Sequence, residues 1–89
     1  MGGDLQSLCL PKRMDADAAV HLMEAFLERK HQAVSVDASK VQQLSTLCVQ
    51  VLLSARKCWE RDGLGFSVEN PSAAFRESVK LLGADILLM

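Results

Sequence analysis

Segments of helical periodicity alternate with short segments rich in β-branched residues, and this alternation limits the folds open to the chain. The first helical segment runs from Asp15 to Lys30, and Asp15 is a good N-cap for it. Its apolar residues recur at intervals of three and four positions, which predicts an amphipathic helix with one buried face. That face is expected to contain Ala16, Ala19, Val20, Met23, Phe26 and Leu27.

A second helical segment ends at Asp62-Gly63, and Gly63 is expected to adopt the left-handed conformation that closes many helices. Ser45 or Thr46 is a suitable N-cap. The apolar residues again follow the spacing of one helix face, so a second amphipathic helix is predicted. These residues are Leu44, Leu47, Cys48, Val51, Leu52, Ala55, Cys58 and Trp59.

A third helix is expected after Asn70-Pro71, because asparagine is a common N-cap and proline is favoured at the first helical position. Gly83 is expected to close this helix. The apolar tail of residues 86–89 is expected to add an edge strand. The buried face of the third helix is expected to comprise Ala74, Phe75, Ser78, Val79 and Leu82.

Three further segments, 5–11, 33–36 and 65–69, carry the alternation or the β-branched content of strands. Strands and helices therefore follow one another as β-α-β-α-β-α, with the tail as a final strand. This order predicts an α/β fold with a mainly parallel sheet joined by right-handed crossovers. The 89 residues are enough for one domain, 1–89.

The charge of the chain argues against nucleic acid as a partner. Ten basic and eleven acidic residues leave a formal net charge of −1, and no run of Lys or Arg is longer than two. Trp59 and three phenylalanines are the only aromatic residues, which is too few for base-stacking platforms. A nucleic-acid binder usually shows a basic patch, so the sequence favours a different partner.

The chain is expected to be cytoplasmic and not inserted in a membrane. No stretch reaches the ~18 to 20 apolar residues that a membrane span needs. Residues 1–4 lack the basic and apolar regions of a signal peptide. The three cysteines, Cys9, Cys48 and Cys58, have apolar neighbours, which favours reduced core thiols over disulfides.

No catalytic, metal or cofactor site is expected. Neither His21 nor His31 has the spacing of a metal motif, and no glycine-rich phosphate loop occurs. Cys48 lies within the apolar series of the second helix, so core packing explains it better than a nucleophilic role.

The segment from Val36 to Leu53 joins a strand, a polar turn, a hydroxyl pair and an apolar helix. It resembles the core signature of STAS domains (sulphate transporter and anti-sigma factor antagonist). The matching residues are Asp37, Ser39, Val41, Leu44, Thr46, Leu52 and Leu53. In two places the sequence departs from the signature, because Ser45 stands where the family usually has an acid and Cys48 where it has glycine.

The resemblance extends over nearly the whole chain, through Met14-Asp15, Asn70-Pro71 and Leu82-Gly83. It implies a STAS-like sheet of four to five strands with three to four helices packed on it. It also implies a phosphoacceptor at the start of the second helix, Thr46 by alignment with Ser45 as the neighbouring candidate. Asp15, Asp37 and Ser39 are expected near that hydroxyl.

Even without phosphorylation, the outer side of the second helix is a candidate partner surface. Residues there that the core does not need would form an exposed apolar patch. The candidates are Leu44, Leu47, Val49, Gln50 and Leu53, with Val49 and Leu53 preferred because they lie beside the main buried series. Thr46 itself has a simpler interpretation as an N-cap.

The functional hypothesis is a non-enzymatic adaptor that binds a signalling histidine kinase or a kinase-like ATPase. The pattern is similar to small STAS proteins encoded with bacterial chemotaxis genes, which makes chemotaxis the expected setting. The alternatives are an anti-sigma factor antagonist switched by Ser or Thr phosphorylation and a cytosolic STAS subunit of a membrane transporter. The chain is expected to be a monomer or a weak dimer.

Overall fold

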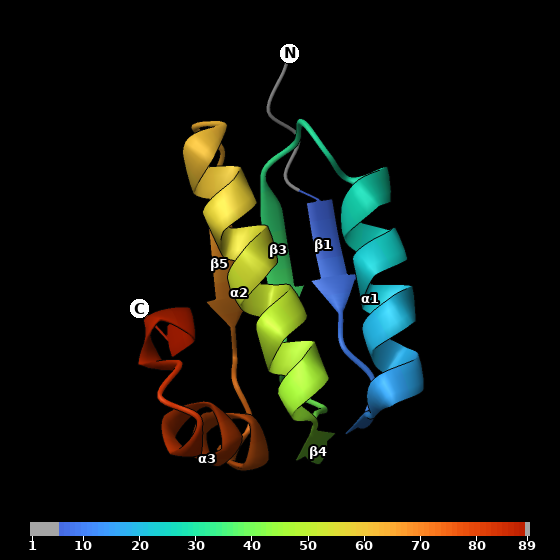
Figure 1. The fold of residues 1–89 in the computed structure, drawn as a ribbon, viewed down its shortest axis with the longest axis vertical. Coiled ribbons are helices and arrows are strands. Elements are labelled where there is room, and N and C mark those ends of the chain that lie inside the picture. The colour runs from blue at the N-terminus through green and yellow to red at the C-terminus, as the bar shows by residue number, and fades with distance from the viewer. Residues whose placement is uncertain (1–5, 89) are drawn as a thin grey trace.

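The computed structural model describes residues 6–88. A parallel sheet forms one layer of the molecule, and two long helices form the other (Figure 1). In chain order the elements are β1 (Gln6–Cys9), β2 (Arg13–Met14), α1 (Ala16–Glu28), β3 (Val34–Asp37), β4 (Gln43–Leu44), α2 (Thr46–Arg61), β5 (Phe66–Glu69), α3 (Ala73–Leu81) and the 3-10 helix η1 (Asp85–Leu88).

The main sheet has three parallel strands in the order β1-β3-β5, so β3 is central. Two further strands, β2 and β4, form a separate parallel pair. The α/β fold and the parallel sheet are as predicted, while the five strands are divided between two sheets. The two-residue strands β2 and β4 were not predicted, because two residues show no periodicity.

Helices α1 and α2 lie side by side on one face of the main sheet and start at the same end of the molecule (Figure 1). Both return against the direction of the parallel strands, so they run in the same direction as each other. Because the helices cover only one face of the sheet, side chains of β3 alternate between buried and partly buried. Val34 and Val36 are fully buried, whereas Ser35 and Asp37 are only partly buried. One face of the sheet therefore supplies the core and the other is polar.

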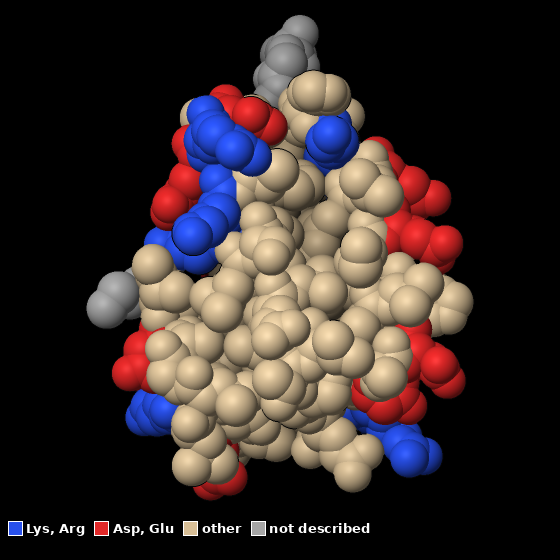
Figure 2. Space-filling view, viewed as in Figure 1, with Lys and Arg blue, Asp and Glu red and all other residues tan. Residues whose placement is uncertain are grey.

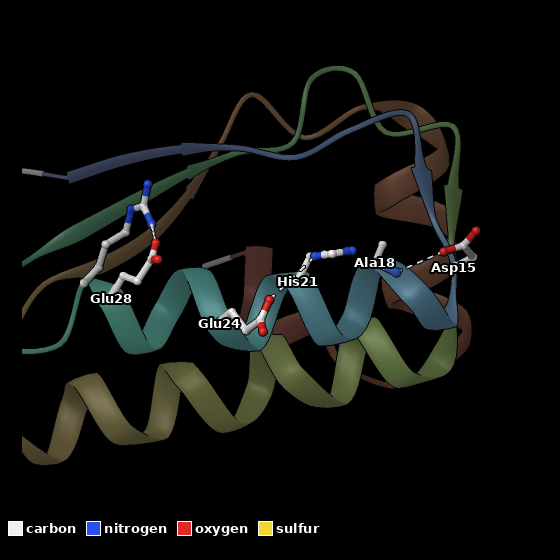
Figure 3. Close-up of polar contacts among 6 residues, drawn as sticks. Asp15, Ala18, His21, Glu24 and Glu28 are labelled. Atoms are coloured by element: carbon white, nitrogen blue, oxygen red, sulfur yellow. Dashed lines mark hydrogen bonds and ion pairs between the residues drawn. The ribbon is translucent and has the colours of Figure 1, made fainter.

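Helix α1 begins where the sequence predicts, but its buried face is narrower. Asp15 is the N-cap, and its Oδ1 accepts a hydrogen bond from the Ala18 N–H at 3.0 Å (Figure 3). The buried residues are Ala19, Leu22 and Phe26. The prediction that Val20, Met23 and Leu27 are buried is wrong, because they are 57%, 52% and 62% exposed, and Ala16 is exposed as well.

The geometry of α1 explains this difference. Its three buried residues follow the spacing i, i+3, i+7, which marks a single stripe along the helix. Only that stripe faces the core, since α1 covers one side of the sheet and has no element on its outer side (Figure 1). The exposed residues Val20, Met23 and Leu27 form a second stripe that the fold itself does not use.

Helix α2 is capped by Ser45, and the core side of the helix carries Cys48, Leu52, Ala55 and Trp59. Gly63 has a φ of +70° and follows the C-cap, as predicted. The Trp59 indole packs edge-on to the Phe26 ring, with 5.6 Å between their centroids. This aromatic contact joins the two long helices above the sheet.

Helix α3 begins two residues later than expected. Ser72, and not Asn70, is the N-cap, and its Oγ accepts from the Phe75 N–H at 3.1 Å. The same hydroxyl donates to the Val41 carbonyl at 2.6 Å, which fixes its position. Asn70 instead occupies the left-handed region with a φ of +50°.

The C-terminal end of the chain also departs from the prediction. Gly83 closes α3 with a φ of +69°, as expected, but Leu82 is exposed and not part of the buried face. The tail forms η1 and not an edge strand, because Leu87 turns into the core instead. Met89, the last residue of the predicted strand, lies outside the described residues. Within residues 6–88, no helix is long and apolar enough to cross a membrane.

Candidate functional site

The paired strands β2 and β4 bring the starts of α1 and α2 together. Met14 is paired with Leu44, so the next residues, Asp15 and Ser45, are neighbours and cap the two helices. The Ser45 N–H donates to the Met14 carbonyl at 2.8 Å. The candidate phosphorylation site therefore lies at a hydrogen-bonded junction between two helix starts.

Ser45 and Thr46 have different roles at this junction. The Ser45 Oγ accepts from the Cys48 N–H at 3.3 Å, and Ser45 is the N-cap. Thr46 is exposed, is the first residue of α2, and its hydroxyl has no hydrogen-bond partner within residues 6–88. The interpretation of Thr46 as the N-cap is therefore wrong, and its hydroxyl is free for chemistry or for a partner.

Cys48 fills the position where the STAS signature has glycine. Its side chain is fully buried, as expected for a core thiol, whereas Cys58 is only partly buried and the same prediction is wrong for Cys9, which is exposed. The Cys48 Sγ lies 3.3 Å from the carbonyl oxygens of both Met14 and Asp15, which share its one hydrogen as acceptors. The thiol thus links the start of α2 to the start of α1, in space that a glycine would leave empty.

Asp37 and Ser39 form a turn at the end of β3. The Asp37 Oδ1 accepts from the Ser39 N–H at 2.9 Å. This bond and one from the Ser39 hydroxyl lower the pKa of the Asp37 carboxyl, burial opposes them, and the charge of Lys40 makes the smallest contribution, which also lowers the pKa. Among the described hydrogen bonds, one joins the Asp15 carbonyl to Cys48 at the start of α2, and none joins Asp37 or Ser39 to Thr46.

Val49 does not belong to the predicted partner surface on α2. Val49 is only 2% exposed, so its choice as a preferred surface residue is wrong. Its position explains this, because Val49 falls on the buried stripe with Cys48 and Leu52. Leu47 is 51% exposed and Gln50 is also exposed. Leu44 and Leu53 are partly buried and pack against the core.

Sequence reasoning missed the contribution of α1 to this surface. Met23 and Leu27 of α1 and Leu47 and Gln50 of α2 line one groove between the two helices. A signal was present, because nine apolar residues in a helix of 13 exceed what one narrow buried stripe requires.

Histidines and acids are spread over the surface. His21 lies 3.6 Å from Glu24 on the exposed side of α1 (Figure 3). In the part of the chain that the structure describes, no three His, Cys, Asp or Glu side chains are placed to hold a metal ion. The junction offers a free hydroxyl, a helix start and an adjoining apolar surface, which suit protein binding and acceptance of a phosphoryl group.

A parallel sheet covered by α1 and α2, with a hydroxyl pair at the start of α2, is the arrangement of a STAS domain. A family model described as "Mlab, STAS domain" matches residues 4–89, and the chain belongs to that family. No curated protein and no solved structure matches the chain. STAS domains are generally non-enzymatic binding modules, so membership supports a role in protein interaction or of the anti-sigma antagonist type.

Proposed function

We propose that this STAS domain binds a signalling histidine kinase or a kinase-like ATPase and modulates its output, in the setting of bacterial chemotaxis. The partner docks at the start of α2. The supporting observation is that Thr46 and Leu47 are both exposed there, with the Thr46 hydroxyl unbonded within residues 6–88. An apolar side chain beside a free hydroxyl gives a partner both contact area and a polar anchor.

The electrostatics of α2 support the same docking end. The first N–H groups of a helix have no acceptor within it, and Ser45 satisfies only that of Cys48. The first turn of α2 contains no acidic residue. The positive end of the helix dipole is thus available to a carboxylate or phosphate of the partner.

The proposal is tested by retention on the immobilised chain. A lysate of the source cells is passed over the native protein, Leu47→Glu and Leu81→Glu, and retained proteins are identified by mass spectrometry. Leu81 is a matched control, because it is 86% exposed but lies on α3. A histidine kinase or kinase-like ATPase should be retained by the native chain and by Leu81→Glu, and lost from Leu47→Glu. Absence of any such kinase on the native chain contradicts the proposal.

A second candidate function is an anti-sigma factor antagonist that is switched by phosphorylation. The difference between the two hydroxyls favours it, since Ser45 is engaged as a cap while Thr46 is free. A phosphate on Thr46 would add about −1.5 to −2 charges at a helix start, where an anion is stabilised.

The phosphorylation hypothesis has a direct test. The chain is incubated with its partner kinase and ATP, and its mass is measured. The gain of one phosphate should occur in the native chain and not in Thr46→Val, which removes the hydroxyl but keeps the shape. An unchanged native mass, or a phosphate that persists in Thr46→Val, counts against this switch.

A further inference from the structure

A groove between α1 and α2 carries apolar side chains that the fold does not use. Met23 and Leu27 on α1 and Leu47 on α2 each expose more than half of their surface and line this groove. Val20 extends the α1 stripe by one turn and is also exposed. Figure 2 shows the same face, with no charged residue across its middle. Such a continuous apolar surface is typical of a binding site.

The shape and length of the groove suit a bound helix. Its volume is about 320 Å³, and Phe26, Ala55 and Trp59 form a buried floor. On the α2 side, the lining runs from Leu47 to Trp59. Over these residues a helix rises about 18 Å, which equals roughly three turns of a bound helix.

Cations surround one end of the groove. Lys30 lines the groove itself, while Lys57 and Arg61 line an adjoining hollow that shares Ser54 and Cys58 with it. None of the three cations forms an ion pair with another residue in 6–88. Figure 2 shows blue groups on both sides of the upper end of this face, with red groups beside those at the upper left. An occupant that carries acidic groups at this end would therefore be favoured.

We propose that the groove receives an amphipathic helix of a protein partner, with acidic residues placed against Lys30, Lys57 and Arg61. The apolar side chains of that helix, spaced i, i+3 or i+4 and i+7, would cover the two exposed stripes. A small ligand on the floor would leave the rims at Leu27 and Leu47 exposed. A symmetric pair of chains would place one concave groove against another, which does not fill either.

This inference rests on the proposed function as a binding module, but concerns a surface beyond the start of α2. The probe is a fluorescent peptide of about 18 residues, or five helical turns. It carries leucines at helical spacing and three glutamates at one end. A second peptide has lysines in place of these glutamates. Binding to the full chain is followed by fluorescence anisotropy at low and physiological salt.

The acidic peptide should bind the native chain about tenfold or more tightly than the basic peptide, and added salt should reduce the difference. Leu27→Ser should weaken binding of the acidic peptide about tenfold, whereas Leu81→Ser should leave that binding unchanged. The double variant Lys30→Glu, Lys57→Glu should reverse the preference between the peptides, whereas Lys12→Glu should leave it unchanged. The unfolding midpoints of all variants are measured to show that they are folded.

Three results would overturn the proposal. The first is equal binding of both peptides, or equal weakening by Leu27→Ser and Leu81→Ser. The second is a native dimer in sedimentation that Leu27→Ser converts to monomer, which would assign the groove to a second copy. The third is dodecanoate binding that depends on Leu27 and Lys30 while neither peptide binds, which would assign it to an anionic amphiphile.

Failure of the groove and failure of the proposed function are distinguishable. If a kinase is retained equally by native chain and Leu27→Ser, and neither peptide binds, the groove inference alone fails. If the acidic peptide binds with the expected reversal but no kinase is retained, only the proposed partner is wrong.

Discussion

The two long helices start side by side, yet their starts differ in charge. Helix α1 is capped by Asp15 and carries Asp17 in its first turn. Helix α2 is capped by the neutral Ser45 and has no acid in its first turn. The carboxylates of α1 offset the positive end of its own dipole, whereas α2 leaves that end uncompensated. The same backbone geometry thus yields one self-contained start and one that can still gain from an external anion.

The largest expected effect concerns Cys48, which holds the two starts together. Cys48→Gly should lower the free energy of unfolding by about 2 kcal/mol, because it removes a buried side chain and adds backbone freedom. Urea unfolding measures this loss. Cys48→Ala keeps a helix-favouring residue and should lose less. A glycine variant as stable as the native chain would show that the thiol contacts with Met14 and Asp15 contribute nothing.

The start of α1 should respond next. Asp15→Ala should cost about 1 kcal/mol for the lost cap, and a further 0.3 to 1 kcal/mol, roughly, for the lost charge. Asp15→Asn separates the two contributions, because the amide still accepts a hydrogen bond but carries no charge. Thermal unfolding at low salt should place Asp15→Asn between the native chain and Asp15→Ala. If Asp15→Asn and Asp15→Ala lower the stability equally, the hydrogen bond of the cap contributes nothing and the charge alone explains the loss.

The start of α2 should show the opposite response to charge. Ser45→Ala should cost about 1 kcal/mol. Ser45→Asp should keep the cap and gain roughly 0.3 to 1 kcal/mol at low salt, because it supplies the missing carboxylate. Thr46→Ala is the matched control and should change stability by less than about 0.5 kcal/mol. If Ser45→Asp is no more stable than the native chain, the charge difference between the starts has no energetic consequence.

The smallest effect concerns a carboxylate that caps a turn instead of a helix. The pKa of Asp37 is lowered in the folded chain, mainly by the Ser39 N–H. Its stabilising contribution is therefore present above the ordinary pKa of 3.8 and is lost as the pH falls through the lower folded value. Acid unfolding curves of native chain and Asp37→Asn should converge at the acid end. Curves separated by a constant amount at all pH values would exclude this charge effect.

The sequence predicts what depends on regular spacing or on a single special residue. The start of α1 at Asp15 and the left-handed Gly63 and Gly83 were found in this way. The cap of α3 was missed because Asn70 and Ser72 are both good caps, and only the bond from Ser72 to Val41 decides between them. That bond joins segments far apart in the chain, so no local pattern reports it.

The candidate surface was predicted less well than the fold. An apolar series as dense as that of α2 fits more than one helical phase. Leu47 was therefore placed both in the buried series and on the partner surface, and Val49 was assigned to the wrong side. The groove depends in addition on α1 lying beside α2, which is a tertiary fact. Thr46 was singled out by resemblance to the family signature, and its free hydroxyl became visible only once Ser45 was identified as the cap.

The common direction of α1 and α2 has a consequence for the kinetics of encounter. Antiparallel helices cancel each other's fields, but α1 and α2 point the same way, and only α1 carries carboxylates at its start that offset its dipole. A chain of formal net charge −1 therefore keeps an uncompensated positive end at the start of α2. An approaching charged protein would rotate the molecule before contact is made. Association rates should therefore fall with ionic strength by more than the small net charge suggests.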